Sequence, residues 1–311
     1  MAYGVPGFRI GHVTDGETHT GCTVVLCPPK TVGSCDCRGS SPATRETALL
    51  APDKTMQEVH AIVLTGGSAF GLAAADGAMK YLSEHDVGYQ TPWVKVPIVP
   101  AAAIFDLNLG SRSVYPTAAE GYRACVEARE NNSMQGNVGA GTGATIGKWA
   151  GADYRMKGGL GVSTVKVENL IVGCVAVVNS VGDVVDAGGR VLVGARKNDG
   201  VFLAPPDGPR LLSGRDVSAV ANTTLVCVAT NAQLSKVNVH RLAQRAHDGM
   251  ARAVVPSHTS YDGDIVFALA CGSVDAAFDV VAEACAEATA QAIRNAATKA
   301  RSAGGVPGSG G

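Results

Sequence analysis

Aromatic residues and excess charge are both scarce in this chain of 311 residues. Phe, Trp and Tyr together make up 5% of the sequence, and the formal net charge is −1. Proteins that bind single-stranded nucleic acid stack bases on aromatic side chains, and nucleic acids and anionic membrane surfaces both attract basic patches. The composition therefore argues against a nucleic-acid partner and against a membrane surface as a partner.

Long apolar runs and a targeting signal are also missing. No uninterrupted apolar run reaches the roughly 18 residues of a membrane span, and residues 1–6 lack the basic and apolar regions of a secretory signal. We therefore expect a cytoplasmic protein with no membrane span. The cysteines number nine, and the four between residues 22 and 37 lack the paired spacing and the nearby His of a zinc site. Free thiols, no metal and no cofactor are expected.

Apolar runs alternate with Gly-rich loops, which predicts a mixed α/β fold. Apolar residues make up 46% of the chain, and there are 39 glycines. Buried strands are expected at 170–178 and after residue 222, and the segment 181–186 reads as a hairpin-like return from the first of them. Helices are expected over 117–129, with Thr117 as N-cap, and over 236–253 and 274–303. We expect one domain over 1–311, with a disordered Gly-rich tail at 304–311.

The pair Asn222-Thr223 lies at the start of an apolar, β-branched run. A Thr hydroxyl at a strand edge is well placed to act as a nucleophile if a base takes its proton. One such base is the α-amine of Thr223 itself, which exists only if the Asn222–Thr223 peptide bond is cut. The Pro- and Gly-rich connector 194–219 lies directly upstream, and a mobile connector would let the new chain end move away.

Polar residues follow or precede several other strands. Gly66-Gly67-Ser68 links the strand 58–64 to a helical segment, so its N–H groups either bind an oxyanion or form a tight turn. Asn179 ends an apolar strand, where it either forms a turn or directs its amide into a site. Asp262 and Asp264 precede another strand, and they either orient an amine or cation or belong to an Asp-Gly turn.

The Gly-rich loop Gly139–Gly147 is followed by Lys148, and it offers an alternative function. The loop matches G-x-G-x-x-A, which makes a nucleotide- or anion-binding protein a rival hypothesis. The surroundings do not fit a dinucleotide site, because no strand precedes the loop and no helix follows it. Lys148 is either a solvated surface residue or a cation placed in a site.

Taken together, these segments resemble the DmpA-type self-processing amidases, a family of L-aminopeptidase/D-esterases, β-aminopeptidases and the nylon-oligomer hydrolase NylC. The resemblance covers nearly the whole chain. It is carried, in order and at comparable spacing, by residues 11–15 with 21–25, by 66–72 and by 222–231. Thr223 with Asp262 and Asp264 is most similar to the Thr-nucleophile, nylon-hydrolase branch.

The resemblance implies a four-layer α/β/β/α sandwich similar to N-terminal-nucleophile hydrolases with different connectivity. It implies self-cleavage into an α chain, 1–222, and a β chain, 223–311, assembled as a homotetramer of processed units. Thr223 Oγ would attack a small peptide, amide or ester, with its freed α-amine as base. Asn179 and an N–H of the Gly66–Ser68 turn would bind the oxyanion. Lys148, Asp262 and Asp264 would orient the Thr terminus and tune its charge.

One position departs from the family pattern. Where relatives carry a Tyr before Asp-Phe, this chain has Phe105 before Asp106, so a hydroxyl is missing and Phe105 is expected only to line the pocket. This departure keeps a further hypothesis open, a catalytically decayed scaffold. Whether the substrate is a D- or L-aminoacyl, a β-aminoacyl or an ω-amino-acid amide does not follow from the residues.

Overall fold

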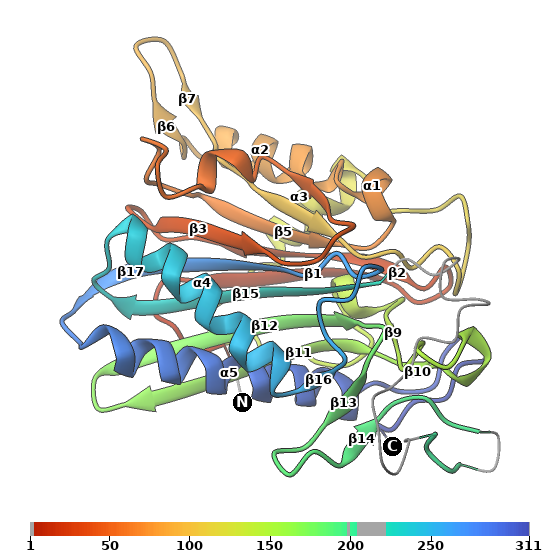
Figure 1. Ribbon diagram of the computed structural model, residues 1–311. Coiled ribbons are helices and arrows are strands. Elements are labelled where there is room, and N and C mark those ends of the chain that lie inside the picture. Colours follow the sequence, from red (N-terminus) through yellow and green to blue (C-terminus); the bar gives the residue numbers. More distant parts are fainter. Residues whose placement is uncertain (1–2, 198–199, 204–221, 311) are drawn as a thin grey trace.

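Two five-stranded mixed sheets stacked face to face form the centre of the protein, and helices cover both outer faces (Figure 1). The computed structural model describes residues 3–197, 200–203 and 222–310. Three hydrophobic clusters separate the four layers: one between the sheets, one under α2 and α3, and one under α4 and α5. The predicted four-layer α/β/β/α architecture is confirmed.

The first sheet has the order β1-β2-β5-β8-β4 and packs against the helices α2 and α3. Helix α3 begins with the predicted capping box. The Thr117 hydroxyl accepts from a backbone N–H of the first turn, and the Glu120 carboxylate accepts from the Thr117 N–H. The bounds are β1 Arg9–Asp15, β2 Thr20–Leu26, β5 Ala61–Thr65, β8 Ala101–Ala103, β4 Ala43–Arg45, α1 Ser68–Gly71, α2 Ala74–Glu84 and α3 Ala118–Val126.

The second sheet has the order β11-β12-β15-β17-β3 and packs against the helices α4 and α5. Side chains alternate along its central strand: Leu225 faces the first sheet and Val226 faces the helices, as the pleat of a strand requires. The bounds are β11 Gly159–Val167, β12 Leu170–Asn179, β15 Thr223–Ala232, β17 Ile265–Val274, β3 Val32–Cys37, α4 Lys236–Ala251 and α5 Phe278–Thr298.

Smaller elements surround these layers. A third sheet has the order β14-β13-β16, and two further strand pairs are β9 with β10 and β6 with β7. Their bounds are β13 Asp183–Val185, β14 Val191–Val193, β16 Val254–Val255, β9 Thr145–Ile146, β10 Met156–Lys157, β6 Tyr89–Gln90 and β7 Lys95–Val96; the short helices are η1 Ala48–Leu50, η2 Gly139–Gly141 and η3 Ala152–Tyr154.

The predicted hairpin-like return at 181–186 is wrong. Strand β13 pairs with β14 and β16, whereas β12 pairs with β11 and β15. The chain therefore leaves the second sheet after Asn179 instead of folding back along β12. As a result, the Asn179 side chain lies at the end of its strand beside the start of β15, rather than inside a turn.

The predicted disorder of the tail at 304–311 is also wrong for its described part, 304–310. The Lys157 N–H donates to Pro307 O at 2.8 Å, the Gly310 N–H donates to Ala300 O at 2.8 Å, and Val306 is buried. Backbone hydrogen bonds and positive φ angles at Gly304 and Gly305 hold this segment against the fold. A Gly-rich composition therefore serves close packing here, which composition alone does not distinguish from disorder.

None of the helices within the described ranges is long and apolar enough to cross a membrane.

Candidate active site

Three strand ends bring the predicted site residues together. Asn179 is the last residue of β12, and it lies directly opposite Thr223, the first residue of β15. Strand β17 runs parallel to β15, so Asp262 and Asp264, just before β17, reach the same edge. All four residues are at most 4% exposed. The topology thus gathers residues from three separate parts of the chain around the start of β15.

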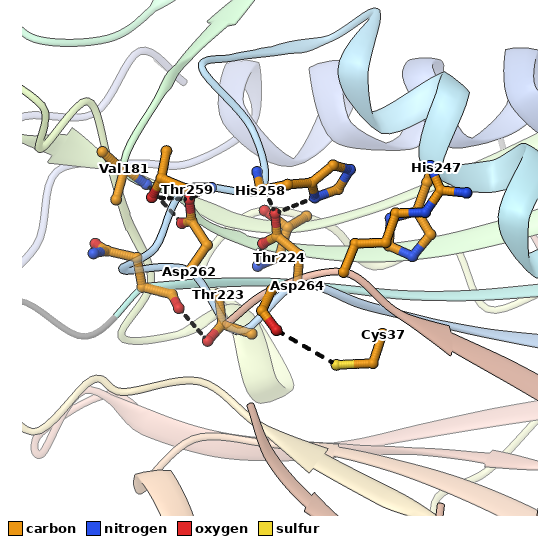
Figure 2. A network of polar contacts seen from close by, with 12 residues as sticks. Cys37, Val181, Thr223, Thr224, His247, His258, Thr259, Asp262 and Asp264 are labelled. Carbon is orange, nitrogen blue, oxygen red and sulfur yellow. Dashed lines mark hydrogen bonds and ion pairs between the residues drawn. The ribbon is translucent and has the colours of Figure 1, made fainter. Parts of the chain in front are cut away.

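The peptide bond between Asn222 and Thr223 lies along the segment that precedes β17. The Gly263 N–H donates to the Asn222 carbonyl oxygen at 2.8 Å, and the Asn222 N–H donates to Tyr261 O at 3.3 Å. The Thr223 hydroxyl donates to the same Asn222 carbonyl oxygen (Figure 2). The nucleophile of the predicted cut therefore lies against the carbonyl group that it would attack.

Asp264 links the start of β15 to a histidine. Its Oδ1 accepts from the Thr224 N–H at 2.7 Å, and its Oδ2 accepts from the His258 N–H at 3.0 Å and contacts His258 Nδ1 at 2.8 Å (Figure 2). Both carboxylate oxygens are thus used, which fixes the Asp264 side chain. An Asp-Gly turn alone would not require these contacts with another strand.

Asp262 is held by its own loop and by the segment after β12. Its Oδ2 accepts from the Thr259 N–H at 3.0 Å and from the Thr259 hydroxyl at 2.6 Å, and its Oδ1 accepts from the Val181 N–H at 3.3 Å. Burial, followed by the negative charge of Asp264, raises the pKa of Asp262 to about 6. Asp262 therefore titrates close to neutrality, in the range that suits proton transfer.

Lys148 is a buried partner of Asn179. Its Nζ donates to Asn179 Oδ1 at 2.8 Å and to Asn179 O at 3.2 Å, and the Thr145 N–H donates to the same Oδ1 at 3.0 Å. Two donors on Oδ1 fix the orientation of the amide, so Nδ2 points the other way. Lys148 is 1% exposed, which excludes the surface alternative. Burial holds its pKa well below the ordinary value.

The Asn179 Nδ2 donates to the backbone carbonyl of Phe105 at 3.1 Å, and its second hydrogen is left for another acceptor. Phe105 therefore contacts the site through its backbone carbonyl, and this contact does not depend on its side chain. The missing hydroxyl at position 105 leaves this contact intact.

The predicted oxyanion role of the Gly66–Ser68 turn is not supported. The Gly66 N–H donates to Gly21 O at 2.8 Å, the Ser68 N–H to Ile104 O at 2.9 Å, and the Gly67 N–H to Asp106 Oδ1 at 2.7 Å. All three amide donors are already used within the protein. The turn needs its glycine for conformation, since Gly67 has a φ of +79°.

The Gly139–Gly147 loop offers no anion site either. Residues 139–148 are buried. The Gly139 N–H donates to Thr14 Oγ1 at 2.9 Å, and the Ala140 N–H donates to Thr23 Oγ1 at 3.1 Å. The loop packs into the hydrophobic cluster between the two sheets through Ala140 and Ala144, and it brings Lys148 to Asn179. This arrangement removes the support for a nucleotide- or anion-binding protein.

Two site residues went unpredicted, His258 and Gly263. Both lie in the polar segment 256–264, of which only the two Asp residues were predicted to belong to the site. A non-Gly residue with positive φ is uncommon, and His258 has a φ of +56° that brings its ring and its N–H to one carboxylate oxygen. The predicted mobile connector, 194–219, falls mostly outside the described residues.

A protein-family model decides the identity of the chain. Residues 3–310 match the model of Peptidase family S58. The chain belongs to peptidase family S58. It is an aminopeptidase or amidohydrolase, and the predicted resemblance is confirmed.

Curated relatives of this S58 peptidase cover most of its length. An uncharacterized aminopeptidase of Mycobacterium leprae is 43% identical over 292 residues, covering 88% of this chain and 78% of that protein. A 6-aminohexanoate-oligomer endohydrolase of Agromyces is 30% identical over 281 residues, covering 88% and 76%. Identity with the mycobacterial protein thus exceeds identity with the nylon-oligomer hydrolase.

Solved structures share the fold of this S58 peptidase. A β-aminopeptidase of Burkholderia has a TM-score of 0.69 at 22% identity and covers 98% of this chain and 89% of that chain. The L-aminopeptidase D-Ala-esterase/amidase of Ochrobactrum anthropi, described as a new variant among the Ntn hydrolase fold, has a TM-score of 0.73 at 20% identity, with 98% and 88% coverage.

Proposed function

We propose that this S58 peptidase cleaves its own chain between Asn222 and Thr223 and then hydrolyses small amides through an acyl group on Thr223 Oγ. The observation that carries the proposal is the contact between the Thr223 hydroxyl and the Asn222 carbonyl at a buried edge lined by Asn179, Asp262 and Asp264. A buried hydroxyl close to a carbonyl group, at the same strand edge as two carboxylates, supports the role of Thr223 as a nucleophile.

In the first reaction, Thr223 Oγ bonds to the Asn222 carbonyl carbon while a loop carboxylate takes the hydroxyl proton. The carbon–nitrogen bond then breaks, the proton passes to the Thr223 nitrogen, and an ester remains. Water hydrolyses this ester, releasing the Asn222 carboxylate and restoring the hydroxyl. The new α-amine, whose ordinary pKa is about 7.7–8.0, serves as base in later turnovers.

For the substrate, we propose amides with a free amino group near the bond that is cut. The name of the mycobacterial relative, an aminopeptidase, agrees with this class. In the second reaction, the free hydrogen of Asn179 Nδ2 would donate to the oxyanion formed from the substrate carbonyl.

The purified wild-type protein should run as two bands on a denaturing gel in place of one band at 31.6 kDa. The N-terminal sequence of the shorter chain should read Thr-Thr-Leu-Val-Cys. A single band after long incubation, from protein that hydrolyses aminoacyl p-nitroanilides, would show that hydrolysis needs no cut.

Self-cleavage should lose rate as the pH falls through about 6, because the pKa of Asp262 is about 6 and only its carboxylate accepts the hydroxyl proton. Freshly synthesised intact chain, incubated between pH 5 and pH 8, gives the rates by gel densitometry. The intact chain lacks the α-amine of Thr223, so that group does not contribute.

The charge of Asp264 helps to raise this pKa, so Asp264→Asn should move the midpoint to lower pH. His258→Asn keeps the Asp264 charge and should leave the midpoint in place. A midpoint that moves in His258→Asn but not in Asp264→Asn would assign the titration to the histidine and contradict the prediction.

A further inference from the structure

A backbone amide with no assigned role, the N–H of Gly263, donates to the Asn222 carbonyl oxygen at 2.8 Å. The other expected donors have different acceptors. Asn179 Nδ2 donates one of its two hydrogens to Phe105 O, and the three amides of the 66–68 turn donate to acceptors of the first sheet and its loops.

The Gly263 amide is held in place from both sides. The carbonyl oxygen of Asp262 accepts from the Ser41 N–H at 3.0 Å. The carbonyl oxygen of Asp264 accepts from the Arg38 N–H at 3.1 Å and from the Gly39 N–H at 3.0 Å. The segment after β3 therefore fixes the peptide plane that carries the Gly263 N–H, and it also fixes the peptide plane that follows Asp264. A donor that does not reorganise during the reaction is the kind that stabilises a transition state most.

A glycine is required for this approach. A Cβ atom at position 263 would lie 2.6 Å from Ser41 O and 2.8 Å from Thr223 Oγ1, both too close for a real contact. The absence of a side chain thus allows the backbone at Gly263 to lie close to both Thr223 Oγ and the Asn222 carbonyl.

The charges around the peptide bond make such a donor necessary. When Thr223 Oγ adds to the carbonyl carbon, the electron pair of the C=O bond moves onto the oxygen. This negative charge would form at a buried edge that already holds Asp262 and Asp264, and repulsion between like charges is strong where water is excluded.

We propose that the Gly263 N–H is the oxyanion donor for the self-cleavage step, while Asn179 serves the later hydrolysis of substrate. The inference rests on the proposed cut at Asn222–Thr223. Thr223 Oγ forms its bond to the Asn222 carbon, the oxyanion is held by the Gly263 N–H, and the charge returns to the C=O bond when the bond to the Thr223 nitrogen breaks. The Asp262-Gly263-Asp264 segment then supplies carboxylates and an oxyanion donor from three consecutive residues.

The test replaces the amide by an ester, because any side chain at 263 would also displace the nucleophile. The chain is made by cell-free synthesis with glycolic acid in place of Gly263, which replaces the N–H by an ester oxygen and adds no side chain. We expect the rate of self-cleavage to fall about 10²-fold or more, the usual effect of losing one oxyanion donor. The control carries glycolic acid in place of Gly136, whose N–H donates to Leu160 O at 2.7 Å and which contacts neither Asn222 nor the 262–264 segment. This control should cleave at the wild-type rate.

The outcomes separate the two proposals. If the wild-type chain made in this way stays intact, the proposed self-cleavage fails. If wild type cleaves and the 263 ester cleaves equally fast, self-cleavage stands and the role of Gly263 is overturned.

A second measurement tests the inference without the ester variant, in case that variant does not fold. In intact Thr223→Ala protein, hydrogen exchange of the peptide that contains Gly263 should be slow, because the Asn222 carbonyl protects this amide. In cleaved wild-type protein the Asn222 end is free to leave, and exchange should be faster. Rapid exchange at Gly263 in the intact chain would overturn the inference.

Discussion

Thr223→Ala should leave the chain as a single band at 31.6 kDa and abolish amide hydrolysis. The substitution removes the only atom that can form the proposed acyl intermediate, and it also prevents formation of the α-amine that serves as base. Because the two losses occur together, we expect kcat/KM to fall by about four to six orders of magnitude, as with the loss of a nucleophile in other hydrolases. Gel analysis and p-nitroanilide release measure the two effects separately.

The adjacent residue provides a matched control for this substitution. Thr224 is fully buried, and its hydroxyl has no hydrogen-bond partner among the described residues. Thr224→Val keeps the shape and the N–H that donates to Asp264, so cleavage and hydrolysis should both persist. Thr223→Ser keeps a hydroxyl and should still cleave itself. Retained hydrolysis in Thr223→Ala would place the nucleophile elsewhere in the chain.

Lys148→Met should lower kcat/KM by about 10²–10³-fold, comparable to the loss of an oxyanion donor. The Lys148 Nζ and the Thr145 N–H together fix the Asn179 amide, and without Lys148 this amide is held by fewer contacts. The Asn179 Nδ2 would then no longer be directed at the oxyanion. Methionine fills a similar volume, so the loss would come from the amino group and its hydrogen bonds rather than from a cavity.

Stability should fall in this variant as well. Burying an amino group is costly, but removing it takes a donor from Asn179 O and Oδ1, and the loss of one partner of a buried pair is destabilising. Denaturant unfolding of Lys148→Met should therefore show a lower midpoint than wild type. A loss of activity no larger than that of an equally destabilised variant would assign Lys148 to the scaffold alone.

A second buried lysine, Lys157, provides a control for the removal of a buried amino group in Lys148→Met. Lys157 is fully buried and donates to Thr142 O and Ala144 O, and burial lowers its pKa to about 7. It makes no hydrogen bond to Asn179. Lys157→Met should leave kcat/KM close to wild type. Equal losses in both variants would show that any buried positive charge near the Gly-rich loop supports activity.

The sequence predicted those site residues whose position follows from the local pattern of apolar and polar residues. Thr223 begins one long apolar run and Asn179 ends another, and alternation and composition predict where strands begin and end. Their face-to-face placement needs the pairing of β12 with β15, which the pattern of either strand alone does not contain. The family resemblance supplied that information, because it placed both residues in one site.

What the sequence did not show is where backbone groups donate. The Gly66-Gly67-Ser68 turn was predicted as either a backbone oxyanion site or a tight turn, and the Asp262-Gly263-Asp264 segment as either a pair of functional carboxylates or an Asp-Gly turn. Only tertiary contacts decide between them: Asp106 and two carbonyl groups take the amides of the first, whereas the Asn222 carbonyl faces the amide of the second. His258 was missed for the same reason, since its positive φ is a property of the folded backbone.

If the chain is cut before Thr223, the central position of β15 determines how long the cleaved enzyme stays folded. This strand is paired on one side with β12 and on the other with β17, and α5 packs on β11 and β12. A cut before Thr223 would leave both pieces interlocked through one shared core, so they would stay together without the covalent link. Once unfolded, however, two separate chains must find each other by diffusion and refold as a bimolecular pair. The mature protein would then persist through slow unfolding rather than through ready refolding, and its lifetime would be set by a rate.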